Sequence, residues 1–112
     1  MSIIKNLKSI YNHPFHSKYK IRGLMNFFKW QISCLINPYP VIYPFTENSK
    51  LIIIKGQTGS TGNLYCGLLE FNDMGFLLHF LRSTDLFLDV GANVGVYTIL
   101  ASAEINCKTI AI

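Results

Sequence analysis

Acidic residues are missing from the first part of this sequence. Residues 1–30 carry six bases and no Asp or Glu, the bases being Lys5, Lys8, Lys18, Lys20, Arg22 and Lys29. Over the whole chain, ten Lys and Arg stand against six Asp and Glu, which permits anionic partners but does not indicate nucleic acid. The basic character therefore belongs to an N-terminal arm. A solvated face is the simplest interpretation of it, and contact with an anionic membrane or ligand is the alternative.

Cysteines are few and lie far apart in the sequence. Cys34, Cys66 and Cys107 are odd in number and form no CxxC pair. This pattern argues against both a disulfide framework and a zinc site. We expect buried free thiols in a reducing compartment.

Long hydrophobic runs are also absent. Lys5 and Lys8 interrupt any secretory signal, and the most apolar early run, residues 30–36, is far short of the roughly 20 residues that a membrane span needs. Half of the 112 residues are hydrophobic, which is typical of one globular domain. The sequence therefore predicts a cytoplasmic protein without a transmembrane segment.

Apolar residues recur at helical spacing between residues 21 and 36. Pro38 and Pro40 end the pattern. The stripe predicts an amphipathic helix whose apolar side packs against the domain, with a helix lying on a bilayer as the alternative. Its residues are Ile21, Leu24, Met25, Phe28, Ile32, Leu35 and Ile36.

Two short β-branched and aromatic runs follow, at residues 41–45 and 51–55, around the polar break TENSK. They predict a β-hairpin. The next segment, GQTGSTGN at residues 56–63, is rich in glycine but lacks the lysine and hydroxyl of a phosphate loop. We interpret it as a flexible connecting loop, with a loop that closes over a ligand as the alternative.

A second helix is predicted up to Arg82, capped by Asn72 or Asp73. Its apolar residues are Met74, Leu77, Leu78 and Leu81. His79 lies on this helix and is interpreted as structural. His13 and His16 flank Pro14 without a third ligand nearby, so no metal site is assigned.

The segment LFLDVGANVG, residues 86–95, predicts a strand followed by a glycine turn. Leu86, Phe87 and Leu88 form the apolar run of a central parallel strand covered on both faces, and Asp89 ends it. A helix should then begin inside the turn, with a buried side of Val96, Tyr97, Ile99, Leu100 and Ala103. Strand, glycine turn and helix is the arrangement that seats a nucleotide at the carboxyl end of the strand.

The spacing within the turn narrows the class of ligand. Gly91 and Gly95 stand four apart, whereas a dinucleotide site shows GxGxxG. Asp89, two residues before the first glycine, suits a positively charged ligand such as a sulfonium with an ammonium better than two phosphates. Asn93 takes the middle place, which asparagine can fill because it tolerates left-handed backbone.

Residues 63–102 resemble the N-terminal half of FkbM-type S-adenosylmethionine-dependent methyltransferases. The likeness lies in the run DVGANVGVYT together with the upstream block FNDMGFLLHFLR and their spacing. It implies a Rossmann-like class I methyltransferase that uses S-adenosylmethionine to methylate a hydroxyl of a sugar or secondary metabolite, so that the partner is a small-molecule or glycan acceptor.

The resemblance also implies a set of cofactor-binding residues. Asp89 would close the first strand, and the turn would lie under the methionine portion of the cofactor. The implied residues are Asp89, Gly91, Ala92, Asn93, Gly95, Tyr97 and Thr98, with Phe71, Asn72 and Asp73 as further contributors. The transfer would be an in-line displacement in which the protein mainly orients the reactants. No residue is assigned as the general base.

A second parallel strand is predicted at KTIAI, residues 108–112. The chain therefore divides into a basic arm and helix (1–40), a hairpin, loop and helix (41–84), and the start of the cofactor-binding domain (85–112). This is an α/β fold that holds only the first two parallel strands of a Rossmann-like sheet. We expect the acid that binds the ribose to follow residue 112, and the chain alone to bind cofactor weakly.

Two other functions remain open. An NAD(P)-binding oxidoreductase shares the strand, turn and helix but should show a third glycine. A non-catalytic module would instead use the basic helix to recruit a membrane or partner, and its binding would be sensitive to salt.

Overall fold

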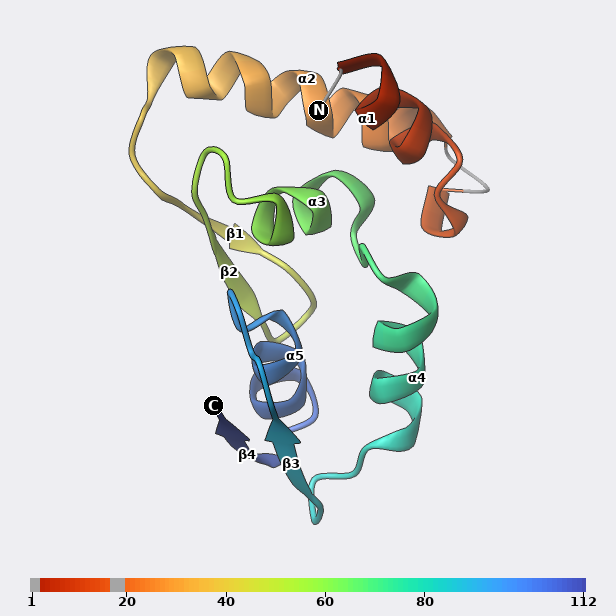
Figure 1. Cartoon of the computed structure of the whole chain (residues 1–112), viewed down its shortest axis with the longest axis vertical. Coiled ribbons are helices and arrows are strands. Elements are labelled where there is room, and N and C mark those ends of the chain that lie inside the picture. The colour runs from red at the N-terminus through yellow and green to blue at the C-terminus, as the bar shows by residue number, and fades with distance from the viewer. Residues whose placement is uncertain (1–2, 17–19) are drawn as a thin grey trace.

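A computed structural model describes residues 3–16 and 20–112 of the chain. The molecule measures 41 × 32 × 24 Å along its principal axes. The two helices of the N-terminal part lie at one end and the last two strands at the other, with the remaining helices between and beside them (Figure 1). In chain order the elements are α1 (Ile3–Tyr11), η1 (Pro14–His16), α2 (Lys20–Ile36), β1 (Val41–Pro44), β2 (Lys50–Ile53), α3 (Thr58–Cys66), α4 (Phe71–Phe80), β3 (Leu86–Asp89), α5 (Val96–Ile99), η2 (Leu100–Glu104) and β4 (Lys108–Ala111).

The described residues form two separate two-stranded sheets. β1 and β2 pair antiparallel, with Val41 opposite Ile53. β3 and β4 pair parallel, with Leu86 beside Lys108, and α5 and η2 make the crossover between them. The predicted hairpin and the predicted parallel pair are both confirmed, and the fold is mixed α/β.

One core joins the hairpin to the parallel pair. Ile53 of β2 and Leu100 at the end of α5 are both 0% exposed. The core draws residues from α2, the hairpin, α3, α4 and the segment after the glycine turn, so the turn packs on a shared apolar base. Its buried members are Trp30, Leu51, Ile53, Leu64, Met74, Leu77, Val96 and Leu100.

The segment predicted as a flexible loop is instead largely helix α3, so that interpretation is wrong. The helix has no apolar stripe, and Ser60, Thr61 and Asn63 are buried. Their side chains bond to backbone close by: both hydroxyls donate to the carbonyl of Gln57, at 3.1 and 2.9 Å. Because these polar groups are satisfied locally, they can be buried without a large penalty.

Helix α2 confirms the predicted span, but its predicted packing side is wrong. Gly23, Phe27 and Trp30 face the protein and are buried. Of the predicted stripe, Leu24 is half-buried. The other six residues form an exposed side, here called the outer face of α2, which consists of Ile21, Met25, Phe28, Ile32, Leu35 and Ile36. The helix has two apolar sides, and the bulkier Phe27 and Trp30 occupy the covered one.

Three further details differ from prediction. Residues 3–11 of the basic arm form helix α1. The N-cap of α4 is Glu70, so Asn72 and Asp73 lie inside the helix. The helix ends at Phe80 because the backbone of Leu81 is extended, and the amide of Arg82 bonds to the Asp85 carboxylate at 2.8 Å.

The strand and helix around the glycine turn also depart from the predicted burial. Leu86 and Leu88 are exposed while Phe87 is half-buried, so β3 is covered on one face only. Ala101 is buried in place of Ala103. The cause is the π-helical geometry of η2, in which each turn takes in an extra residue and so rotates the side chains that follow.

A smaller cluster binds α1, α2 and α3 together through Ile10, Phe27 and Cys66. The three cysteines are free thiols, with Cys66 and Cys107 buried and Cys34 half-buried. Burial raises the pKa of the Cys66 thiol to about 11.

Cys66 should therefore resist alkylation in the folded protein. At pH 8 a thiol with that pKa is about 0.1% thiolate, against roughly a quarter for an ordinary cysteine, so labelling should be at least about 100-fold slower. Timed iodoacetamide labelling read by peptide mass spectrometry measures this, with the same reaction in denaturant as the control. Equal rates at Cys66 in the folded and unfolded chain would contradict the packing of α3 on α1.

Candidate functional site

The main chain between β3 and α5 makes an open turn with three left-handed residues. The backbone φ angle is +76° at Gly91, +52° at Asn93 and +76° at Gly95. Glycine adopts these angles freely and asparagine tolerates them, so each residue suits its place. The amide of Gly95 donates to the carbonyl of Ala92 at 2.8 Å, which closes the turn immediately before α5 begins.

The end of the second parallel strand holds the turn from one side. The carbonyl of Ile112 accepts hydrogen bonds from the amides of Gly91 (2.9 Å) and Ala92 (3.2 Å). The amide of Ile112 in turn donates to the carbonyl of Asp89 at 2.9 Å. The carboxyl ends of the two strands therefore meet at the turn.

Helix α3 supports the turn from another side. A Cβ added at Gly59 would lie 2.9 Å from a methyl carbon of Val94, so α3 and the turn are in close contact. At Gly91 and Gly95, by contrast, an added Cβ would meet nothing within 4 Å. The turn is thus supported by α3 and the strand ends, and it is open where its two glycines lie.

Asp89 and Thr98 are brought together at the end of β3. The Thr98 hydroxyl donates to one carboxylate oxygen, Oδ2, of Asp89. Both residues are half-buried. The bond fixes the carboxylate beside the turn, where its charge can act on a cationic ligand.

Tyr97 points to a different partner. Its hydroxyl donates to Glu70 Oε2 at 2.6 Å, across 27 residues of sequence. Burial, the bond to Glu70 and the charges of Glu70, Asp73 and Asp89 all raise the pKa of Tyr97. The phenol therefore stays protonated at neutral pH and serves as a hydrogen-bond donor.

Glu70 is the residue that the sequence did not single out. It lies directly before the block FNDMGFLLHFLR, and only the folded chain brings it to Tyr97. Of the further residues implied by the resemblance, Asp73 acts on Tyr97 through its charge, while Asn72 is exposed. Phe71 makes edge contacts with His13 and Phe15 and belongs to the link with the N-terminal arm.

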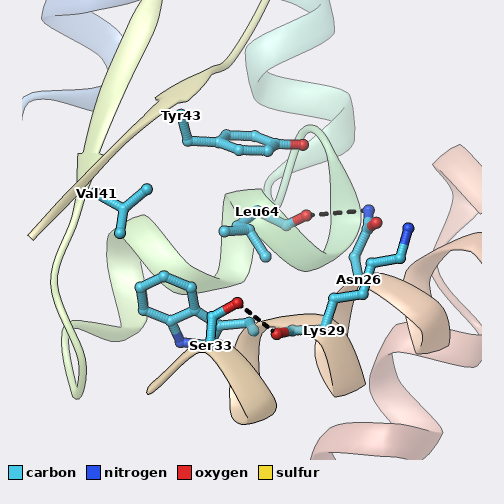
Figure 2. A pocket seen from close by; sticks show the side chains of 7 residues that line it. Asn26, Lys29, Ser33, Val41, Tyr43 and Leu64 are labelled. Carbon is cyan, nitrogen blue, oxygen red and sulfur yellow. Dashed lines mark hydrogen bonds between the residues drawn. The ribbon is translucent and has the colours of Figure 1, made fainter. Parts of the chain in front are cut away.

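Of two hollows in the described surface, only the second comes near the glycine turn. The first, about 230 Å³, is formed by α2, α3 and the hairpin; Figure 2 shows Val41 and Tyr43 across from Asn26 and Lys29. The second, about 910 Å³, runs between α4 and β3 and reaches the site region through Asp73 and Tyr97, with His79 also in its lining. His79 is exposed on α4.

The part of the chain that the structure describes holds neither a cluster of metal ligands nor a membrane-spanning helix. No group of three or more His, Cys, Asp or Glu gathers closely enough there to hold a metal ion. None of the helices in residues 3–16 and 20–112 has both the length and the apolar character required to cross a membrane.

Comparison with known proteins adds no relative. No family model, curated protein or solved structure matches this chain.

Proposed function

We propose that this chain carries the S-adenosylmethionine-binding segment of a Rossmann-like methyltransferase that acts on a hydroxyl group of a small molecule or glycan. The observation that carries the proposal is the run β3, open turn, α5 and parallel β4, with left-handed backbone at Gly91, Asn93 and Gly95. In α/β sheets of this kind, ligands bind outside the carboxyl ends of the strands, where this turn lies.

The residues present fit the methionine end of such a cofactor. The space at Gly91 and Gly95 is open, and a side chain at either position would occupy it. The Asp89 carboxylate supplies negative charge beside that space and would pair with the cofactor's ammonium. Thr98 would orient that carboxylate through its hydroxyl.

The fit is poorer for a dinucleotide. Two backbone amides of the turn, those of Gly91 and Ala92, already donate to the carbonyl of Ile112. A pyrophosphate depends on such amides and is repelled by a nearby carboxylate such as that of Asp89. These contacts favour a cationic ligand over NAD(P).

The cofactor would supply a methyl group on a sulfonium, which is a good leaving group for in-line transfer to an oxygen. The chain's own contribution is to bind and orient. Asp89 and the turn would fix one end of the cofactor, and the protonated Tyr97, anchored by Glu70, would keep α4 beside α5.

Amide chemical shifts of the ¹⁵N-labelled chain test the proposal, because NMR detects both tight and weak binding and maps it to residues. S-adenosylhomocysteine should shift the amides of residues 89–98, and NAD should not. Asp89→Asn should weaken binding about tenfold or more by removing the charge that faces the ammonium. Glu47→Gln, which removes an exposed charge on the hairpin, is the matched control and should bind as the unaltered chain does.

Three results would count against this function. They are shifts that map to the hollow beside α2, equal shifts with NAD, or an unchanged affinity in Asp89→Asn. A lack of any shift at millimolar ligand would also reject binding by this chain.

A further inference from the structure

Helix α2 exposes an apolar side that nothing in the described structure covers. Its other side is already used, since Trp30 and Phe27 pack into the two apolar clusters of the protein. At about 100° per residue, the six residues of the outer face fall within about 100° of the helix circumference. Leu35 is 84% exposed and Ile36 80% exposed. Figure 1 shows α2 along one edge of the molecule beside α1, with α3 and the strands below it.

The charged residues of α2, which lie at the two borders of this outer face, are all bases. On the helix circumference, Arg22 and Lys29 follow one border of the apolar residues, and Lys20 lies beyond the other border. All three are exposed, and the amine of Lys20 rests 4.9 Å from the centre of the Tyr11 ring. The first acidic residue of the sequence is Glu47, so no carboxylate from α1 or α2 neutralises these charges.

We propose that the outer face of α2 binds the surface of an anionic lipid bilayer. A wide apolar stripe bordered by Lys and Arg is the pattern of a helix that lies in the interface plane. The apolar side chains would enter the boundary of the acyl chains, and the bases would contact lipid phosphates. At 17 residues the helix is about 26 Å long, and it would lie flat on the membrane rather than cross it.

A second copy of the chain fits this face less well. Two outer faces brought together would place the bases at the borders of one face against the bases at the borders of the other, with no acid of α2 between them. Like charges in contact are destabilising, whereas an anionic surface complements them. The charge pattern therefore favours the bilayer.

Vesicle co-sedimentation of the full chain tests this proposal. We expect binding to vesicles of phosphatidylcholine with 30% phosphatidylserine, little binding to phosphatidylcholine alone, and loss of binding at high salt. The double variant Phe28→Ser/Ile32→Ser should bind at least about tenfold more weakly. Arg22→Gln/Lys29→Gln should bind about 25-fold more weakly, at roughly fivefold per base.

Phe76→Ser/Phe80→Ser is the matched control, because it removes two exposed apolar rings from α4 and leaves α2 intact. This variant should bind the vesicles to the same extent as the unaltered chain. Circular dichroism confirms that each variant is folded, which is expected because the altered side chains are exposed.

Quenching by brominated lipid reports the orientation without depending on loss of binding. The single tryptophan, Trp30, lies on the covered side of α2 and should be quenched little. Phe28→Trp adds a second tryptophan on the outer face, which should be strongly quenched.

Several outcomes would overturn the proposal. They are binding that ignores lipid charge, no binding in low salt, equal loss in the α4 control, or a dimer in solution that Phe28→Ser/Ile32→Ser dissolves. Because these readouts involve no methyl donor, their failure is distinguishable from failure of the proposed cofactor site.

Discussion

Leu100→Ala is expected to lower the free energy of unfolding by about 2 to 5 kcal/mol. Leu100 is 0% exposed and lies in the core that joins α5 to the hairpin and to α2. Truncating it removes apolar burial and leaves a cavity that the surrounding side chains fill only in part. Urea denaturation followed by circular dichroism measures the change.

Leu35→Ala is the matched control because it makes the same substitution at an exposed position on α2. It should change the free energy of unfolding by no more than about 0.5 kcal/mol. If both variants unfolded at the same urea concentration, the burial of Leu100 in a core shared by these elements would be contradicted. The outcome matters for function because the glycine turn stands on that core.

Asn63→Asp is expected to destabilise the protein by about 3 kcal/mol or more at pH 7. Asn63 is 1% exposed; its amide nitrogen donates to the carbonyl of Gly59 at 2.7 Å, and its oxygen accepts from the amide of Leu69 at 2.8 Å. An aspartate keeps the acceptor but places a negative charge in the interior, facing the Gly59 carbonyl. Helix α3, which supports the turn, would be weakened directly.

The loss should depend on pH. Burial raises the folded-state pKa of the new carboxyl above its unfolded value of about 3.9. As pH rises past that value the unfolded chain releases its proton first, so the destabilisation grows. Near pH 3.5 the protonated carboxyl can again donate to Gly59, and the difference from the unaltered chain should shrink.

Measuring the free energy of unfolding of Asn63→Asp and of the unaltered chain at each pH separates this effect from general acid sensitivity. Asn72→Asp, at an exposed position in the first turn of α4, is the control. Its free energy of unfolding should stay within about 0.5 kcal/mol of that of the unaltered chain at every pH. A constant penalty for Asn63→Asp from pH 3.5 to 7 would mean that the side chain is not buried as described.

The parts of the fold that local pattern determines could be predicted. The strand at Leu86, the turn at Gly91 and Gly95, and the second strand at residues 108–112 follow from apolar runs and glycine spacing, and the structure confirms them. The hairpin follows in the same way from two β-branched runs around a polar break.

The parts that depend on contacts between distant segments could not be predicted. Helix α3 has no apolar period because its buried side chains are polar, and their partners become visible only in the fold. The spacing along α2 shows an apolar stripe but not which of two apolar sides the protein covers. Glu70 reaches Tyr97 across 27 residues, and no spacing rule connects them.

The carbonyl of Ile112, which accepts from two amides of the turn, links the shape of the proposed cofactor seat to the docking of the last strand. If that strand frays, the amides of Gly91 and Ala92 lose their hydrogen-bond acceptor, and the turn that would hold the cofactor becomes less ordered. The glycine turn and β4 should therefore unfold locally as one cooperative unit. A ligand bound at the turn would stabilise the pairing of β3 with β4. A firmly paired β4 would in turn lower the entropic cost of ordering the turn when the ligand binds.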